Sequence, residues 1–161
     1  MVFSRPMAIV SAAILLSLPA ASSIAGVIFR FEIGPAFAAN APNMKKGTAF
    51  AVRALACATP AKPQVIAFAH AFVNGARQSA ILDLVPLETA GAYAVPYPSL
   101  WPRGTAGVVS LVGTCDSAHT GAVVTLGPNG FVRESSKLLD RAPSEADVDE
   151  ALAALKSTGA R

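Results

Sequence analysis

The sequence is poor in the side chains on which most enzyme chemistry depends. Its 161 residues include only two histidines, two cysteines and one tryptophan. It has neither the G-x-S-x-G elbow of serine hydrolases nor a phosphate-binding glycine loop. The acids Asp83, Glu88 and Asp116 stand alone, unlike the paired carboxylates of glycoside hydrolases. We therefore expect a protein without catalytic activity, without a cofactor and without a metal site.

Charge is also sparse. Asp, Glu, Lys and Arg together make up 14% of the residues, and the formal net charge is +3. Proteins that bind single-stranded nucleic acid have clustered basic residues interleaved with aromatic residues. The basic residues of this chain are scattered and have no aromatic residues interleaved with them. This excludes nucleic acid from the expected partners.

One long apolar run is present, at residues 7–29. Arg5 precedes it and Pro19 interrupts it, as in a secretory signal peptide. Small residues permit cleavage after Ala25 or after Ala38. We therefore interpret residues 1–38 as a signal peptide or a membrane anchor. The anchor is the alternative because a run of 23 residues is long enough to span a bilayer. Both readings place the domain outside the cytoplasm; a third reading makes the run a buried helix of the domain.

Short alternating apolar segments dominate the rest of the chain. After a polar linker at 39–47, residues 48–131 predict six to seven antiparallel strands with turns about every ten residues, the pattern of an all-β sandwich. Asn74 and Gly75 between two apolar runs predict a tight hairpin. One strand is expected over 78–87. Residues 132–161 are predicted to form a loop and then a short C-terminal α-helix.

The expected helix has start and end signals. Ser144 with Asp147 three residues later resembles a capping box, and Gly159 follows the last turn. Val148, Leu152 and Leu155 form one narrow apolar stripe. We expect this helix to dock on the sandwich; the alternative is a frayed tail.

The two cysteines, Cys57 and Cys115, each end an expected strand, and an even cysteine count in an exported chain favours a disulfide. The alternative is a reactive or metal-binding Cys115 beside His119. The other histidine, His70, lies on the same strand face as Phe68 and Phe72, which favours a hydrogen-bonded histidine at the edge of a core. Two histidines with Met44 could form a copper(I) site only if the fold brought them together.

Rigid aromatic residues stand among the prolines of the segment "YPSLWPRG". Such residues are favoured on binding surfaces, because they bury a large area at low entropic cost. We therefore consider Tyr97, Leu100 and Trp101 a candidate binding loop. The alternative is that Trp101 closes the end of the sandwich.

The stretch "GAYAVPYPSLWPRGTAGVVSLVG", residues 91–113, resembles the second half of small exported bacterial immunoglobulin-like domains of the YtkA-like and FixH-like group. The resemblance implies an immunoglobulin-like β-sandwich that is secreted, periplasmic or tethered to the membrane. It also implies a binding or accessory role with a protein partner in the cell envelope. Some members of that group are implicated in copper handling, which makes a metal-handling accessory protein the alternative function. Their methionine- and histidine-rich elements have no matching positions here.

Overall fold

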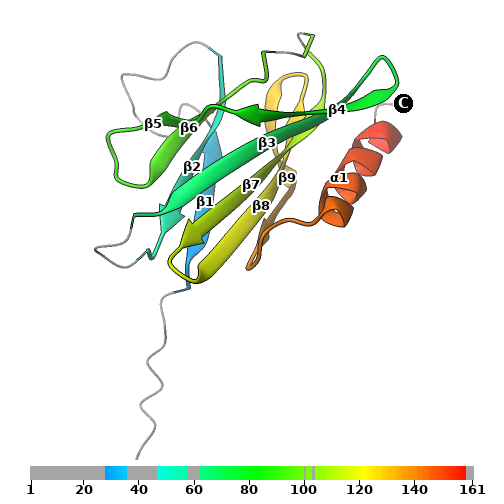
Figure 1. Cartoon of the computed structure of the whole chain (residues 1–161). Helices are drawn as coiled ribbons and strands as arrows, with labels where there is room; N and C mark the ends of the chain where they lie inside the picture. Colours follow the sequence, from blue (N-terminus) through cyan, green and yellow to red (C-terminus); the bar gives the residue numbers. More distant parts are fainter. Residues whose placement is uncertain (1–27, 36–46, 58–61, 100, 103, 159–161) are drawn as a thin grey trace, which may run out of the picture.

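Two antiparallel β-sheets face each other, and one helix covers the outer side of the larger sheet (Figure 1). The computed structural model describes residues 28–35, 47–57, 62–99, 101, 102 and 104–158. Within these ranges it contains nine strands and one α-helix. The predicted β-rich architecture with a short C-terminal helix is confirmed, with nine strands where six to seven were expected.

The smaller sheet, sheet A, has four strands in the order β1-β2-β6-β5. These are β1 (Arg30–Pro35), β2 (Thr48–Leu55), β6 (Ala92–Pro96) and β5 (Val85–Pro86). The larger sheet, sheet B, has five strands in the order β4-β3-β7-β8-β9. These are β4 (Ala76–Leu82), β3 (Gln64–Val73), β7 (Gly107–Cys115), β8 (Ala118–Gly127) and β9 (Gly130–Leu139).

The core lies between the two sheets, and both sheets contribute side chains to it. Sheet A contributes large side chains, among them Phe31, Phe50 and Val52, which are buried. Sheet B contributes leucines and valines of β7 and β8, among them Leu111 and Leu126, and the alanines Ala67, Ala69 and Ala71 of β3. Because side chains alternate along a strand, the other residues of β3 point to the opposite face of sheet B.

The hairpin predicted at Asn74 and Gly75 is confirmed. These two residues join β3 to β4, and their φ angles are 52° and 79°. Asparagine and glycine adopt such positive φ angles more readily than other residues, and a tight hairpin turn requires them.

Two strands lie outside the segment predicted to form the sandwich. β1 falls within residues 1–38, which were assigned to the leader, and pairs with β2 from Arg30 opposite Leu55 to Pro35 opposite Phe50. β9 occupies the start of 132–161, so the loop expected there is wrong as far as Leu139. β9 is an edge strand with mostly polar, exposed side chains, and it therefore lacks the apolar alternation that marks a half-buried strand.

The single strand expected over 78–87 is also wrong. β4 ends at Leu82 in sheet B, and β5 begins at Val85 in sheet A. Two residues between them carry the chain from one sheet to the other. The alternating apolar pattern continues through this crossing, because Leu82 at the end of β4 is buried and Leu84 between the strands packs against the same core. Periodicity alone therefore does not reveal the change of sheet.

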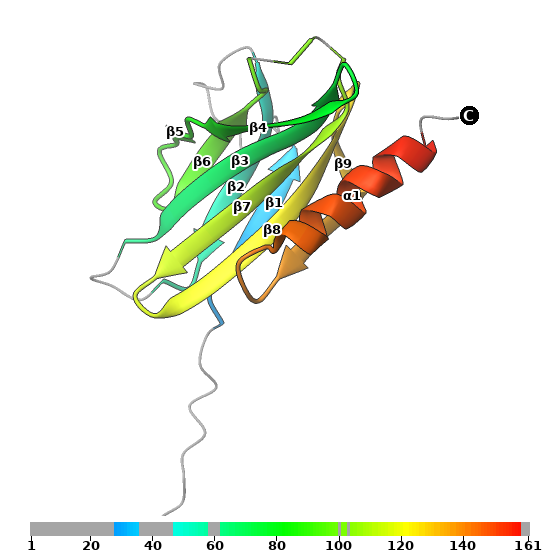
Figure 2. The same cartoon turned by 45° about the vertical axis from the view of Figure 1, so that its right-hand side comes forward.

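The helix α1 (Glu145–Thr158) packs on the outer face of sheet B (Figure 2). Val148 and Leu152 are buried against Val108 of β7 and Val123 of β8. At its start the Asp147 backbone amide donates to Ser144 Oγ at 3.3 Å, while the Ser144 amide donates to the Asp147 carboxylate at 2.7 Å. The predicted capping box and the docked position are thus confirmed. Among the described residues, no helix has the length and apolar character needed to cross a membrane.

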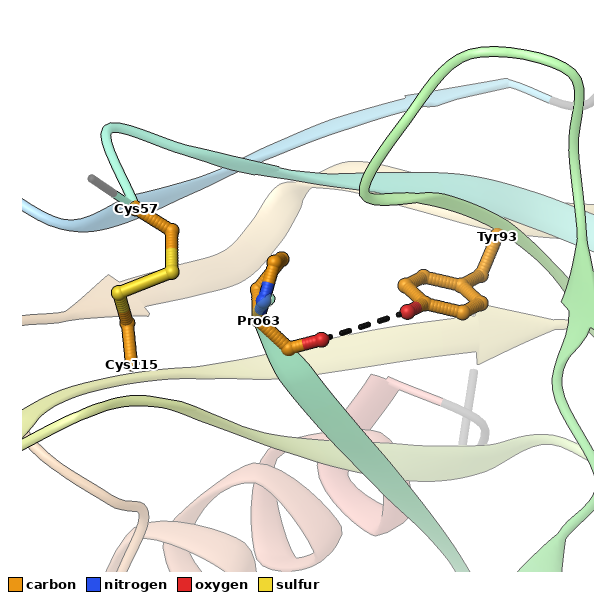
Figure 3. The surroundings of a disulfide bond; sticks show 4 residues. All are labelled: Cys57, Pro63, Tyr93 and Cys115. Atoms are coloured by element: carbon orange, nitrogen blue, oxygen red, sulfur yellow. Dashed lines mark hydrogen bonds between the residues drawn. A yellow bond between two sulfur atoms is a disulfide. The ribbon is translucent and has the colours of Figure 1, made fainter. Parts of the chain in front are cut away.

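The predicted disulfide is confirmed and links the two sheets. Cys57, just after β2, is bonded to Cys115 at the end of β7, with Cα atoms 5.6 Å apart (Figure 3). Close to it, the Tyr93 hydroxyl donates a hydrogen bond to the Pro63 carbonyl oxygen at 3.4 Å, which connects β6 to the segment entering β3. Covalent and polar contacts therefore hold the sheets together at this end of the sandwich, which we call the disulfide end.

Removing the disulfide should destabilise the domain strongly. It closes a loop with a sequence separation of 58 residues, and the chain-entropy model gives about 4 kcal/mol for a loop of this length. We expect the double variant Cys57→Ala with Cys115→Ala to lose about that much unfolding free energy in urea titrations followed by circular dichroism. The reduced wild-type protein is the control and should match the variant. Equal midpoints for the oxidised and reduced proteins would contradict this account.

Candidate binding site

A pocket of about 540 Å³ opens at the end of the sandwich opposite the disulfide. Its walls come from the segment between β6 and β7, the residue before β2 and the turn between β8 and β9. β2 runs from this pocket to Cys57, and β8 runs back from near Cys115 to the pocket. Ten residues of β8 at about 3.3 Å each place roughly 30 Å between the two ends.

Prolines and turns shape the segment between β6 and β7. The Tyr97 amide donates to the Gly47 carbonyl oxygen at 2.8 Å, which ties the segment to the start of β2. Two reverse turns follow, in which the Trp101 amide donates to Pro98 and the Thr105 amide donates to Pro102. Proline fixes φ at the value these turns need and donates no hydrogen bond to a sheet, so the segment folds back on itself instead of extending β6.

Trp101 belongs to the core of the domain. Its side chain is 8% exposed and packs with the buried residues between the sheets. A Cβ added at Gly107 would lie 2.5 Å from the Trp101 ring, so the ring occupies the space that glycine leaves open on β7. The alternative given above, that Trp101 closes the end of the sandwich, describes its position.

Tyr97 is placed differently, because 40% of its surface is exposed. Its hydroxyl reaches the turn between β8 and β9, where a Cβ added at Gly130 would lie 2.9 Å from Tyr97 Oη. The ring therefore stands at the mouth of the pocket and bridges two of its walls. The third residue of the candidate loop, Leu100, lies outside the described residues.

The pocket is lined by aromatic rings, prolines and neutral polar groups. None of its described lining residues carries a formal charge. Its described lining side chains are two aromatic rings, three prolines, one amide and two hydroxyls: Tyr97, Trp101, Pro98, Pro102, Pro128, Asn129, Ser99 and Thr105. Such a surface offers apolar contact and a few hydrogen bonds, which suits an uncharged part of a ligand. Tyr97 and Trp101 were recognisable from the sequence as aromatic residues among prolines. The opposite wall at Pro128 and Asn129 was not predicted, although "GPNG" is typical of a turn.

His70 lies away from this pocket, on the outer face of sheet B. It is 6% exposed, and its ring nitrogens each lie 2.9 Å from a serine hydroxyl, Nδ1 from Ser79 Oγ on β4 and Nε2 from Ser110 Oγ on β7. A neutral ring satisfies both contacts by donating from one nitrogen and accepting at the other. The expected hydrogen-bonded histidine is confirmed, but it lies on the helix-covered face and not between the sheets.

Burial lowers the pKa of His70, and the nearby positive charge of Arg77 lowers it further. Glu145 and Asp149 of α1 act in the opposite direction. These two carboxylates bind the Arg77 guanidinium at 2.7 and 2.6 Å, which connects the helix to β4. The neutral form of His70 is therefore the one favoured beneath the helix.

The two histidines do not share a site. His70 is level with Val108 on β7, whereas exposed His119 is level with Thr114. Six residues of strand separate these levels, which corresponds to roughly 20 Å. The described part of the chain contains no group of three His, Cys, Asp or Glu side chains that could hold a metal ion. Met44 lies outside the described residues, and the histidine pair on which a copper site would depend is not formed.

Cys115 has no free thiol in this structure, because its sulfur is bonded to Cys57. The alternative in which a Cys115 thiolate acts beside His119 therefore requires the disulfide to be absent. Cys115 is buried at the end of β7 and His119 is exposed at the start of β8.

Comparisons with protein-family models, with curated proteins and with solved structures find no match for this chain.

His70 should make the stability of the domain depend on pH. Because its pKa is lowered in the folded state, the unfolded chain binds the proton more readily, and stability is lost as the pH falls below about 6.5. We expect the melting temperature of the wild type to fall between pH 7.5 and pH 5, and we expect a smaller fall in His70→Gln. The matched control is His119→Gln, which changes an exposed histidine and should leave it intact. An unaltered pH dependence in His70→Gln would contradict the assignment.

Proposed function

We propose that this protein is a non-catalytic binding domain of the cell envelope, exported from the cytoplasm, which engages a protein partner through the pocket at Tyr97. The observation that carries the proposal is the position of Tyr97. It presents an exposed aromatic ring at the mouth of a preformed pocket whose described lining is uncharged. Exposed aromatic side chains on rigid segments are typical of the residues that dominate protein interfaces.

The contacts that hold Tyr97 and Trp101 in place support this role. Tyr97 is fixed at its own amide by Gly47, and the buried ring of Trp101 holds the other side of the loop against β7. A partner that binds Tyr97 therefore orders little additional chain, which reduces the entropic cost of association. The neighbouring prolines act in the same direction.

The strand order supports the immunoglobulin-like part of the proposal. In immunoglobulin domains one sheet has the order A-B-E-D, the other contains C, F and G, and a disulfide joins strands B and F. Taking β1 to β8 as A, B, C, C′, D, E, F and G gives that arrangement here, with the disulfide between the end regions of β2 and β7. β9 is then an additional strand beside G. This agreement also supports the resemblance of residues 91–113 to the YtkA-like and FixH-like domains.

Export is supported by the disulfide and by the N-terminal sequence. Structural disulfides persist in oxidising compartments and are rare in the cytosol. The apolar run at residues 7–29, preceded by Arg5, is the kind of sequence that directs a chain out of the cytoplasm or anchors it in the membrane. The disulfide lies in the folded domain and the apolar run lies before it in the chain, and both favour an extracytoplasmic domain.

Tyr97 and Trp101 should respond differently to substitution by alanine. Tyr97→Ala removes a partly exposed ring and should change the unfolding free energy by less than about 1 kcal/mol, whereas Trp101→Ala should lower it by about 3–5 kcal/mol. Urea unfolding measures both. Nearly equal losses would contradict the distinction between an exposed binding residue and a core residue.

Binding itself can be tested in cells with a photo-crosslinking amino acid at position 97. We expect a discrete crosslinked band containing one envelope protein. The matched control is position 66, because Ile66 is also about half exposed but lies on the outer face of sheet B. The same bands from positions 97 and 66 would contradict the proposal.

Tryptophan fluorescence gives a second test, because Trp101 is the only tryptophan of the chain and lines the pocket. The purified partner should shift the emission of the wild type but not that of Tyr97→Ala.

A further inference from the structure

The strand β1 begins at Arg30, directly after the apolar run at 7–29, and forms part of the folded domain. We infer that the leader is cleaved between Ala25 and Gly26, and that Ala38 is not a processing site. The inference rests on the export of the chain proposed above. It concerns a proteolytic site that the sequence left open between two positions.

β1 is held by pairing along its whole length. Six consecutive residues of β1 pair with β2, from Arg30 to Pro35. Its polar residues Arg30 and Glu32 are exposed, while Phe31 between them is 2% exposed. This alternation is that of a strand with one face in the core, and it explains the two charges that are out of place in a signal peptide.

Two phenylalanines at the start of β1 fill the core. Phe29 and Phe31 are both buried, with ring centroids 6.4 Å apart. The Phe31 ring crosses to sheet B, where a Cβ added at Gly113 would lie 2.6 Å from Phe31 Cζ. β7 thus has a glycine at the position where the ring approaches its backbone.

Cleavage after Ala38 would remove β1 and both rings. It would leave a cavity between the sheets beside Gly113 and would expose the edge of β2, which now pairs with β1. An exposed strand edge is a site for aggregation, and an unfilled cavity of this size is strongly destabilising. Cleavage after Ala25 keeps every described residue of β1.

The sequence around Ala25 suits this processing. Ser23 and Ala25 are small and follow Pro19 within the apolar run, whereas Ala38 follows the strand. A leader peptidase would use water to hydrolyse the Ala25–Gly26 peptide bond. The acyl group becomes the carboxylate of Ala25, and the nitrogen becomes the new amino terminus at Gly26. Arg30, the first residue of β1, is opposite Leu55 near Cys57, so β1 begins at the disulfide end of the sandwich.

The test is to express the full chain in an exporting bacterial host, fractionate the cells and measure the intact mass. We expect the wild-type protein in the envelope fraction to begin at Gly26. Ala25→Arg should retain the leader, because arginine does not fit the small-residue position before the cut. The matched control Ala38→Arg should still begin at Gly26.

Other outcomes separate this inference from the proposed function. An envelope protein that begins at Ala39, or that is blocked by Ala38→Arg and not by Ala25→Arg, would overturn the processing site while leaving export intact. A full-length wild-type protein in the membrane fraction would also overturn cleavage, because the run would then be an anchor. Full-length protein in the cytoplasm would contradict export itself, and with it the proposed function.

A second measurement tests whether β1 belongs to the domain. Phe31→Ala in the oxidised, exported protein should lower the melting temperature by roughly 10 °C or more, or should prevent accumulation of folded protein. Glu32→Ala is the matched control, since it changes an exposed residue on the same strand and should have little effect. An unchanged melting temperature in Phe31→Ala would overturn the inference.

Discussion

The close packing of aromatic rings against glycines of β7 is the constraint on which this fold depends. The Phe31 ring of sheet A lies over Gly113, and the Trp101 ring lies over Gly107. Close-packed interiors have little room for a change of one methylene group, so each ring requires the small residue opposite it. This complementarity determines which strands belong to the domain, because a sheet A without β1 would leave the space at Gly113 empty.

The two ends of the sandwich have different roles as a consequence. At one end the disulfide and the Tyr93 contact close the sheets together, and the chain enters β1 there. At the other end Trp101 fills the gap at Gly107, and the prolines around it build a pocket outside the core. The stabilising contacts at the first end allow the second to carry an irregular, proline-rich segment that contributes little regular pairing.

Local signals in the sequence predicted the elements with local causes. The turn at Asn74 and Gly75, the cap at Ser144 and the disulfide each depend on residue types that have few other structural uses. β1 was missed because its apolar residues continue the run of a leader, although Arg30 and Glu32 gave the alternation of a strand. β9 was missed because none of its side chains is fully buried and its middle is polar, so the pattern of a half-buried strand is absent. A local sequence pattern does not reveal that β1 pairs with β2 or that β9 pairs with β8.

In the candidate site, too, local residue patterns predicted some features, while others depend on residues distant in the sequence. The prolines between Tyr97 and Trp101 predicted an irregular aromatic segment, but the exposure of each ring depends on a distant glycine. Gly107 receives the ring of Trp101, whereas Gly130 gives room to the hydroxyl of Tyr97 at the rim. Both rings thus reach the pocket from one segment, and the described part of its lining adds neutral hydrogen-bonding groups beside them.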